Sequence, residues 1–285
     1  MKAQLIDGKR ISAEIKAEAA EEAAALKAKG ITPCLAVVLV GDDSASQVYV
    51  NNKKKACEAV GIRSVSHVLS GGTTEEALLE LIAKLNADQD IHGILVQMPV
   101  PKQIDERKVI LAIDPKKDVD CFHPVNVGNL HTGGEGFLPC TPAGIIELIK
   151  RSGHSIEGKQ CVVIGRSNIV GKPVAMLLMQ ENGTVTICHS RTRNLAEICR
   201  GADIIVSAVG KVNTVTADMV KEGAILIDVG MNRNEAGKLC GDVDFENVKE
   251  IAGAITPVPG GVGPMTIAML MKNCNTAAKI QNGLK

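Results

Sequence analysis

An uninterrupted apolar run that ends in a glycine constrains the fold of this chain more than any other feature. Residues 161–164 run directly into Gly165, and a short polar turn then leads through Gly171 into a helix-like segment at 173–179. A continuous apolar run of this length is typical of a strand buried on both faces of a parallel sheet. The glycine allows a tight turn, and Pro173 suits the first turn of a helix. The stretch therefore predicts a strand, a turn and a helix whose N-terminus could bind phosphate.

The turn matches the dinucleotide-binding pattern G-x-G-x-x-G only in part. Gly165 occupies the first glycine position, Ser167 the second and Val170 the third, with Gly171 one place later. Two interpretations follow: the glycine serves the geometry of the turn alone, or the turn holds the phosphates of a dinucleotide. The rest of the sequence favours the second.

Composition sets the class of protein. The length of 285 residues suggests about two domains, and 45% hydrophobic residues are enough to build a core. A formal net charge of zero and 1% aromatic residues argue against nucleic-acid and anionic-membrane surfaces. Nine scattered cysteines without a C-x-x-C pair, no secretory signal and no membrane span lead us to expect a cytoplasmic protein. No His, Cys and Asp cluster has metal-ligand spacing, so we expect no metal.

Helices and strands are expected to alternate through the first half of the chain. Thr73 and Glu76 have the spacing of a capping box. We expect helices at 12–29, 46–60, 73–86 and 104–113, and strands at 34–40, 64–69 and 91–96. This alternation predicts a parallel sheet, in which ligands bind at the carboxyl ends of the strands. The helix after Val40 and the turn at Gln97 are therefore candidate site positions.

On that helix, Tyr49 and Lys53 are four residues apart and share one face. Lys53 belongs to a run of three lysines, which is usually a solvated helix surface. Its place near the carboxyl end of a strand favours instead a lysine that exchanges protons with a bound molecule. The pattern alone leaves both interpretations open.

The second half repeats the alternation. We expect helices at 143–151, 173–179, 194–200, 217–220 and 266–280, and strands at 161–164, 184–188, 203–209 and 224–229. Two of these strands lead to Gly210 and Gly230, where a dinucleotide would lie, and Met231 should contact it. The final helix is expected to pack on the first domain, which would make that domain discontinuous.

The strand at 184–188 ends in His189-Ser190-Arg191, where a chain that binds NAD tends to carry an acidic residue. Ser190 and Arg191, with Arg166 from the first turn, instead suit the 2′-phosphate of NADP. The alternative is that both arginines are ordinary surface charges.

Six segments, in order along the chain, match the motifs of one family. They are YVNNK at 49–53, GILVQMPVP at 93–101, KDVD at 117–120, PCTPAG at 139–144, GRSNIVGKP at 165–173 and TPVPGGVGPMT at 256–266. In these segments, and over essentially its whole length, the chain resembles the bifunctional methylenetetrahydrofolate dehydrogenase/cyclohydrolase family. The resemblance implies two α/β domains with a cleft between them. One is a folate-binding catalytic domain at 1–140 with the C-terminal helix 266–285, and the other is a Rossmann-like NADP-binding domain at 141–265.

The resemblance also implies a function. It is the NADP-dependent oxidation of 5,10-methylenetetrahydrofolate and the hydrolysis of the product to 10-formyltetrahydrofolate, in the one-carbon metabolism that serves purine biosynthesis. Tetrahydrofolate derivatives are the expected partners, and a homodimer is the expected assembly. The rival functions are a monofunctional dehydrogenase and a non-catalytic module that senses NADP. The joint presence of Tyr49, Lys53 and Gln97 disfavours the first, and an intact set of pterin-side residues disfavours the second.

The matched motifs imply a role for each candidate residue. Lys53 would relay protons, Gln97 would bond Lys53 and the folate, and Tyr49 would pack on the folate and steady Lys53. Asp120 would pair with the amino group and ring nitrogen of the pterin, since a carboxylate accepts two parallel donors. Without the resemblance, Asp120 could be an ordinary turn carboxylate and Gln97 a cap on its strand. The loop expected near the folate and nicotinamide rings contains Pro259, Gly260 and Gly261. The residues expected to bind NADP are Gly165, Arg166, Ser167, Ser190, Arg191, Gly210 and Met231.

One position departs from the family pattern. Cys121 follows Asp120, where the family usually has glycine. If that glycine had a positive φ, Cys121 would be strained or the turn would shift, and the pterin pocket would change. The alternative, which we favour, is that the position never needed a positive φ.

Overall fold

The apolar run that opens the second half forms strand β5 (Gln160–Ile164) in the computed structural model, which describes residues 3–284. The described chain divides into two units, and each has its own parallel sheet. The first unit contains residues 14–140 and 267–284, and the second contains residues 3–13 and 141–266. The α/β class and the parallel sheets are as predicted.

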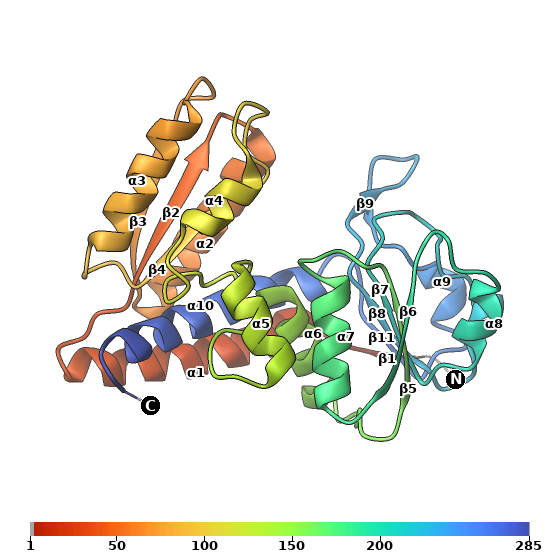
Figure 1. Ribbon diagram of the computed structural model, residues 1–285. Helices are drawn as coiled ribbons and strands as arrows, with labels where there is room; N and C mark the ends of the chain where they lie inside the picture. The colour runs from red at the N-terminus through yellow and green to blue at the C-terminus, as the bar shows by residue number, and fades with distance from the viewer. Residues whose placement is uncertain (1–2, 285) are drawn as a thin grey trace. The chain divides into compact units, whose positions relative to one another are not determined.

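The first unit is built on a three-stranded parallel sheet in the order β3-β2-β4 (Figure 1). Its strands are β2 (Cys34–Val40), β3 (Arg63–Leu69) and β4 (Gly93–Val96). Its helices are α2 (Ser44–Val60), α3 (Glu75–Ala87), α4 (Glu106–Ala112) and α5 (Pro124–Thr132), with most of α1 (Gly8–Ala28) and α10 (Val262–Gln281). The central strand β2 is buried along all seven residues, because neighbouring strands cover its edges and helices its faces.

Two helices far apart in sequence pack together within this unit. Asn275 on α10 donates to the carbonyl oxygen of Ala19 on α1 at 2.8 Å, and Lys279 forms an ion pair with Glu22. The end of α10 also reaches the sheet, because the side-chain amide of Gln281 donates to the carbonyl oxygen of His92 at 2.7 Å. The final helix therefore packs on the first unit, as predicted.

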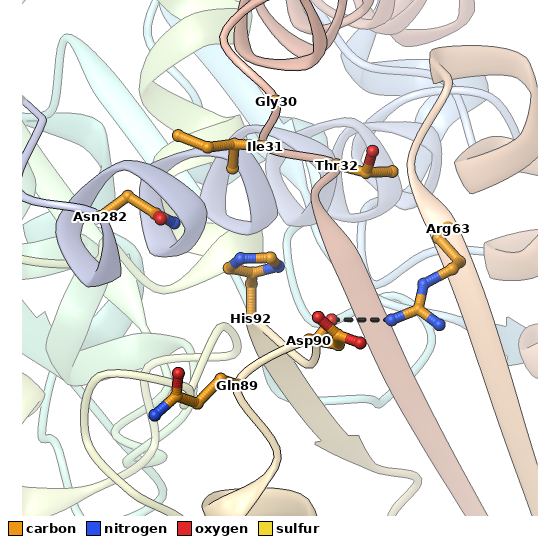
Figure 2. A pocket seen from close by; sticks show the side chains of 8 residues that line it. All are labelled: Gly30, Ile31, Thr32, Arg63, Gln89, Asp90, His92 and Asn282. Carbon is orange, nitrogen blue, oxygen red and sulfur yellow. Dashed lines mark hydrogen bonds between the residues drawn. The ribbon is translucent and has the colours of Figure 1, made fainter.

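A polar cavity of about 480 Å³ lies at the amino end of the three-stranded sheet (Figure 2). Arg63, Asp90 and His92 line it, and the guanidinium of Arg63 donates to the carbonyl oxygen of Asp90 at 2.9 Å. None of the candidate site residues lines this cavity. Ligands of parallel sheets bind at the carboxyl ends of the strands, so the site is expected at the opposite end.

The second unit contains a six-stranded parallel sheet in the order β1-β11-β8-β7-β5-β6. Its other strands are β1 (Gln4–Leu5), β6 (Thr184–Cys188), β7 (Ile204–Ser207), β8 (Ile225–Asp228) and β11 (Ala254–Ile255), and a hairpin is formed by β9 (Asn232–Arg233) and β10 (Leu239–Cys240). Its helices are α6 (Cys140–Arg151), α7 (Gly171–Gln180), α8 (Leu195–Arg200) and α9 (Phe245–Val248), with the 3-10 turn η1 (Ala217–Met219).

α7 covers one face of the sheet, and α8 and α9 cover the other (Figure 1). The chain runs from β5 out to β6 and then back to β7 on the other side, so a topological switch point lies between β5 and β7.

The N-terminus differs from the expected division of the chain. Residues 3–13 were expected in the folate-binding domain, and they belong to the second unit. The physical reason is strand pairing: Gln4 lies opposite Ala254 and Leu5 opposite Ile255, which makes β1 the edge strand of the six-stranded sheet. A two-residue strand is too short to show a periodic pattern in the sequence.

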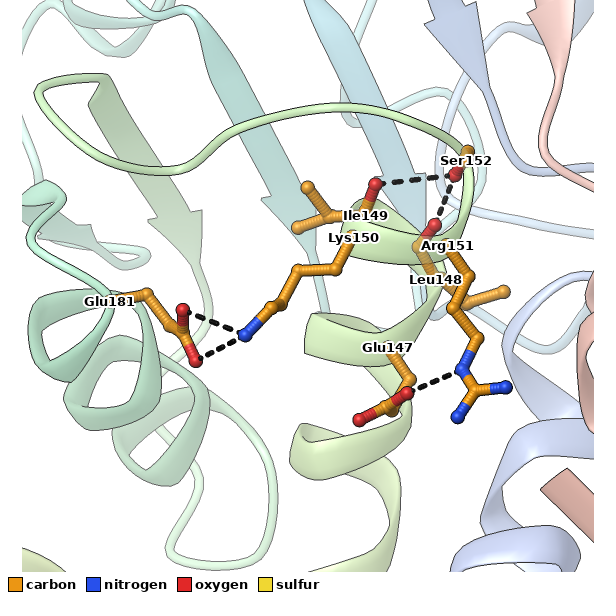
Figure 3. A network of polar contacts seen from close by, with 7 residues as sticks. All are labelled: Glu147, Leu148, Ile149, Lys150, Arg151, Ser152 and Glu181. Atoms are coloured by element: carbon orange, nitrogen blue, oxygen red, sulfur yellow. Dashed lines mark hydrogen bonds and ion pairs between the residues drawn. The ribbon is translucent and has the colours of Figure 1, made fainter. Parts of the chain in front are cut away.

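Polar contacts attach the end of α6 to its surroundings (Figure 3). Lys150 pairs with Glu181 at 3.0 Å, and Arg151 pairs with Glu147 one turn earlier at 2.6 Å. Pairs that reach solvent in this way contribute about 0.2–1 kcal/mol each. Burial of the apolar face of α6 therefore dominates its packing. The fully buried residues on that face are Ile145, Leu148 and Ile149.

Candidate active site

The residues predicted to act on folate meet at the carboxyl end of the three-stranded sheet. Lys53 on α2 donates from Nζ to Oε1 of Gln97, which directly follows β4, at 3.0 Å. The amide nitrogen of Gln97 donates in turn to the carbonyl oxygen of Met98 at 2.7 Å, so the glutamine side chain is fixed at both ends. Lys53 is only 9% exposed, whereas Lys54 and Lys55 are exposed. The solvated-surface interpretation therefore fits the other two lysines of the run and does not fit Lys53.

Asp120 interacts electrostatically with Lys53. Burial raises the pKa of the Asp120 carboxyl, and the positive charge of Lys53 acts in the opposite direction. The negative charge of Asp118 adds to the rise, and the thiol of Cys140, 3.9 Å from Oδ1, opposes it weakly. Asp120 is therefore a half-buried carboxyl group, close enough to Lys53 to interact with its positive charge.

The two charged residues before Asp120 in the KDVD segment have structural partners. Lys117 donates from Nζ to the carbonyl oxygens of Leu85 at 3.0 Å and Asp88 at 2.6 Å, at the C-terminus of α3, where a cation is favourable. Asp118 accepts hydrogen bonds from the amide of His123 at 2.8 Å and from the side chain of Asn126 at 2.8 Å. These contacts fix the turn that presents Asp120.

Sequence reasoning missed a residue that holds this turn from a distant helix. Asn273 on α10 donates from Nδ2 to the carbonyl oxygens of Val119 at 2.8 Å and Leu138 at 2.9 Å. The thiol of Cys140 donates to the same Val119 oxygen at 3.5 Å. The one signal in the sequence was an asparagine within the apolar stretch of the final helix.

Cys121 has a positive φ of 61°, which contradicts the alternative that we favoured from the sequence. Its side chain is 1% exposed, and its thiol donates to the carbonyl oxygen of Phe137 at 3.2 Å. The turn keeps the left-handed conformation that glycine adopts without strain, and cysteine occupies it at a cost.

Tyr49 lies one helical turn before Lys53 on α2 and is 39% exposed. The structure therefore gathers Lys53, Gln97 and the charge of Asp120 in one place, with Tyr49 on the same helix face as the lysine. This arrangement can hold a planar polar molecule and exchange a proton with it.

The candidate cofactor residues lie along the carboxyl edge of the six-stranded sheet. Ile164 of β5 lies opposite Cys188 of β6, so the turn with Arg166 and the turn with Ser190 and Arg191 leave neighbouring strands at the same level. These three side chains are exposed, and residues 189–192 contain no carboxylate. Two guanidinium groups and a hydroxyl in this position fit a phosphorylated dinucleotide.

The turn after β5 is shaped by close packing and by a cap. A Cβ on Gly165, whose φ is 125°, would lie 2.4 Å from the carbonyl oxygen of Ala208, so only glycine fits beside β7 at the switch point. The hydroxyl of Ser167 accepts hydrogen bonds from the amides of Val170 at 3.1 Å and Gly171 at 3.2 Å. The serine in the second glycine position therefore satisfies the amides of the N-cap residue and of the first residue of α7, whose N-terminus faces the same edge.

Gly210 and Met231 follow β7 and β8 on the same edge of the sheet. Gly210 is exposed, and Met231 is 56% exposed. Because β6, β5, β7 and β8 are neighbours in this order, the structure brings all seven candidate cofactor residues to one edge.

The glycine-rich loop that includes Pro259 has a close neighbour within its own unit. A Cβ on Gly8 would lie 1.8 Å from the carbonyl oxygen of Gly261, and a Cβ on Gly261 would lie 2.6 Å from the carbonyl oxygen of Pro257. Packing inside the protein therefore accounts for Gly261. The predicted contacts of Pro259 and Gly260 with a ligand stay a prediction.

Comparison with known families agrees with this arrangement of a catalytic unit and a Rossmann-like dinucleotide-binding unit. Residues 6–120 match the catalytic domain of tetrahydrofolate dehydrogenase/cyclohydrolase, and residues 139–282 match its NAD(P)-binding domain. The chain belongs to the tetrahydrofolate dehydrogenase/cyclohydrolase family, which confirms the resemblance seen in the sequence.

Similar proteins cover the whole chain. "Bifunctional protein FolD" from Acetivibrio thermocellus is 60% identical over 285 residues, with 100% of both chains covered. The crystal structure of the bifunctional enzyme FolD, methylenetetrahydrofolate dehydrogenase/cyclohydrolase, from Campylobacter jejuni has a TM-score of 0.95 and 53% identity, covering 98% of this chain and 99% of that one. The Trypanosoma brucei N5,N10-methylenetetrahydrofolate dehydrogenase-cyclohydrolase, complexed with NADP and an inhibitor, has a TM-score of 0.92 and 42% identity, covering 98% of each chain.

Proposed function

We propose that this chain is a bifunctional enzyme of one-carbon folate metabolism whose two reactions depend on different residues. It oxidises 5,10-methylenetetrahydrofolate to the 5,10-methenyl compound with NADP, and it hydrolyses that compound to 10-formyltetrahydrofolate. The observation that carries the assignment of residues is the hydrogen bond from buried Lys53 to Gln97, within the field of Asp120.

Hydrolysis requires proton exchange. Water adds to the methenyl carbon, the bond from that carbon to N5 breaks, and the formyl group stays on N10. The attacking water loses two protons and N5 gains one, so the step releases one proton overall. Lys53 exchanges these protons, and Gln97 holds its amine in place and bonds the folate.

Hydride transfer does not require proton exchange by the protein, because the folate nitrogens stabilise the cation that forms. NADP, when bound, supplies the hydride acceptor. Asp120 binds the amino group and ring nitrogen of the pterin through two parallel hydrogen bonds, and Tyr49 packs on the folate. For this reaction the residues of the chain chiefly orient the substrate.

The second unit holds NADP along the carboxyl edge of its sheet. Arg166, Ser190 and Arg191 bind the 2′-phosphate, because guanidinium groups match phosphate oxygens. The turn of Gly165 and Ser167 and the N-terminus of α7 hold the remaining phosphates. The turns with Gly210 and Met231 contact the rest of the cofactor, and the loop from Pro259 to Gly261 lies close to the substrate.

The rival function is a monofunctional dehydrogenase that has lost the hydrolysis. Assays of the purified protein separate the two possibilities: reduction of NADP or NAD with 5,10-methylenetetrahydrofolate, and hydrolysis of 5,10-methenyltetrahydrofolate without a nucleotide. We expect both reactions, with NADP preferred to NAD. Reduction without hydrolysis would establish the rival.

The assembly and the compartment are further parts of the proposal. We infer a homodimer in the cytoplasm. All nine cysteines are free, which suits a reducing compartment.

The seven-residue strand β3 is an edge strand and Val68 on it is 67% exposed, so a second copy could cover it. Light scattering should give twice the chain mass, and Val68→Lys should lower it if β3 forms the interface.

No helix among residues 3–284 has the length and apolar character needed to cross a membrane. Within the same residues, no group of three or more His, Cys, Asp or Glu side chains is arranged to hold a metal ion.

A further inference from the structure

A fully buried carboxylate holds the turn after β7. Asp242 is 0% exposed and follows the short strand β10. Its Oδ2 accepts hydrogen bonds from the hydroxyl of Ser207 at 3.1 Å and from the amides of Val209 at 2.8 Å and Gly210 at 3.3 Å. The last residue of β7 and the first half of the turn beyond it are therefore tied to one oxygen atom.

The other oxygen of Asp242 links this turn to the chain beyond β8. Oδ1 accepts hydrogen bonds from the amide of Lys211 at 2.9 Å and from the side chain of Asn232 at 2.9 Å. Asn232 directly follows Met231, which we assign to the cofactor. A carboxylate offers about four lone-pair sites, so these contacts use its full capacity.

A second carboxylate interlocks with the first. Asp228 accepts hydrogen bonds from the amides of Gly230 at 3.0 Å, Asp242 at 2.8 Å and Val243 at 3.0 Å. A Cβ on Gly230 would lie 2.1 Å from Oδ1 of Asp242, and a Cβ on Gly241 would lie 1.8 Å from Oδ2 of Asp228. Each carboxylate fills the space that a side chain on the facing glycine would need, so the two turns are held in one arrangement.

We propose that Asp242 is a positioning residue for the cofactor: it fixes the turns that carry Gly210 and Met231 in the shape that binds NADP. The inference rests on the proposed function, in which these turns contact the dinucleotide. The packing around Asp242 also indicates which part of NADP these turns contact. The amides of residues 209–211 point at one anion, as in the backbone nests that bind phosphate. Because the chain's own carboxylate fills this nest, these turns meet an uncharged part of NADP.

Titration calorimetry of NADP binding to Asp242→Asn tests the proposal. The amide has the same shape, but its NH2 group cannot accept the hydrogen bonds that one carboxylate oxygen accepts now. We expect the Kd for NADP to rise at least about tenfold, with a stoichiometry still near one. A merely structural defect would instead lower the stoichiometry, because part of the protein would be unfolded, and leave the Kd of the remainder unchanged.

A second variant covers the case in which Asp242→Asn does not fold. Asn232→Ala removes one donor to Asp242 and leaves no charge unpaired, and we expect a several-fold rise in the Kd for NADP. Asp244→Asn is the matched control, because Asp244 is two residues away and bonds Asn247 rather than these turns. Hydrolysis of 5,10-methenyltetrahydrofolate should stay near the parent rate in all three variants, since Lys53 and Gln97, which we assign to its proton exchange, lie in the first unit.

Failure of the positioning role of Asp242 and failure of the proposed function give different results. An unchanged Kd in folded Asp242→Asn, or in Asn232→Ala when Asp242→Asn does not fold, would overturn the positioning role and leave the proposed function intact. A parent protein that does not bind NADP would instead refute the proposed function itself.

Discussion

A cysteine with a left-handed backbone stands next to the carboxylate that we assign to the pterin. Cys121 has φ = 61°, a conformation that costs a residue with a side chain about 1–2 kcal/mol. Its buried thiol and the hydrogen bond to Phe137 offset part of that cost. The left-handed conformation of Cys121 sets the direction of the chain after Asp120, so it bears on the pterin site that we propose.

Glycine should be tolerated better than alanine at this position, the reverse of the usual order inside a fold. Cys121→Gly and Cys121→Ala both lose the thiol, but only alanine keeps the strain. We expect the glycine variant to unfold with a free energy about 0.5–1 kcal/mol above that of the alanine variant, because relief of strain exceeds the entropy cost of glycine. Urea unfolding of the pair measures the difference. A more stable alanine variant would show that the position is not strained.

Asp120→Ala should weaken folate binding and leave NADP binding nearly unchanged. A charged, two-point hydrogen bond contributes about 1.5–3 kcal/mol, so affinity for a folate analogue should fall at least about tenfold. Calorimetric titration of the variant with the analogue and with NADP gives both values. Asp90→Ala, an exposed carboxylate at the amino end of the same sheet, is the control. Equal folate affinity in the Asp120 variant and its parent would reject the assignment.

Arg191→Ala should raise the KM for NADP and barely change the KM for NAD, because we propose that its guanidinium pairs with the 2′-phosphate that only NADP carries. Lys159→Ala removes an exposed cation at the amino end of β5 and serves as the control for net charge. If the Arg191 variant kept the full NADP preference of its parent, the assignment would pass to Arg166.

At the scale of elements, the sequence predicted the long and strongly patterned segments. The strand at 34–40 and the strand at 184–188 coincide with β2 and β6. It did not predict α5, whose sequence has few apolar residues and an internal glycine, or the two-residue strands β1 and β11. Short strands form because partners distant in sequence pair with them, and local pattern does not contain that information.

The start of α3 lies one residue later than the capping-box pattern predicts. Thr74, rather than Thr73, is the N-cap, and its hydroxyl accepts a hydrogen bond from the amide of Ala77 at 3.2 Å. Thr74→Ala should therefore lower the free energy of unfolding by about 1 kcal/mol, whereas Thr73→Ala should change it by less than about 0.5 kcal/mol. Chemical unfolding of the two variants decides which threonine caps the helix.

Over the whole molecule, the motifs identified the candidate residues. They did not identify the residues that hold the candidate residues and their turns in place. The meeting of Lys53 and Gln97 follows from two strand ends on one edge of a sheet, which the alternation of elements implies. Asn273, which holds the Asp120 turn, comes from the far end of the chain. The amide of Asp242 donates to the carboxylate of Asp228, which brings the chain after the β9–β10 hairpin against the end of β8. Such contacts depend on tertiary structure, so a linear pattern does not reveal them.

The central claim is that one enzyme carries two reactions and that only one of them needs Lys53. Lys53→Met keeps the length of the side chain and removes its exchangeable protons and its hydrogen bond to Gln97. Lys54→Met, the exposed neighbour on the same helix, is the matched control and should retain both activities.

The most direct measurement is therefore the pair of half-reactions on purified Lys53→Met. Loss of a general acid–base group lowers a rate by about 10²–10⁴-fold, so hydrolysis of 5,10-methenyltetrahydrofolate should fall by at least about a hundredfold. Reduction of NADP with 5,10-methylenetetrahydrofolate should survive at a substantial fraction of the parent rate. Undiminished hydrolysis in this variant, or loss of both reactions in a folded variant that still binds folate and NADP, would contradict the account.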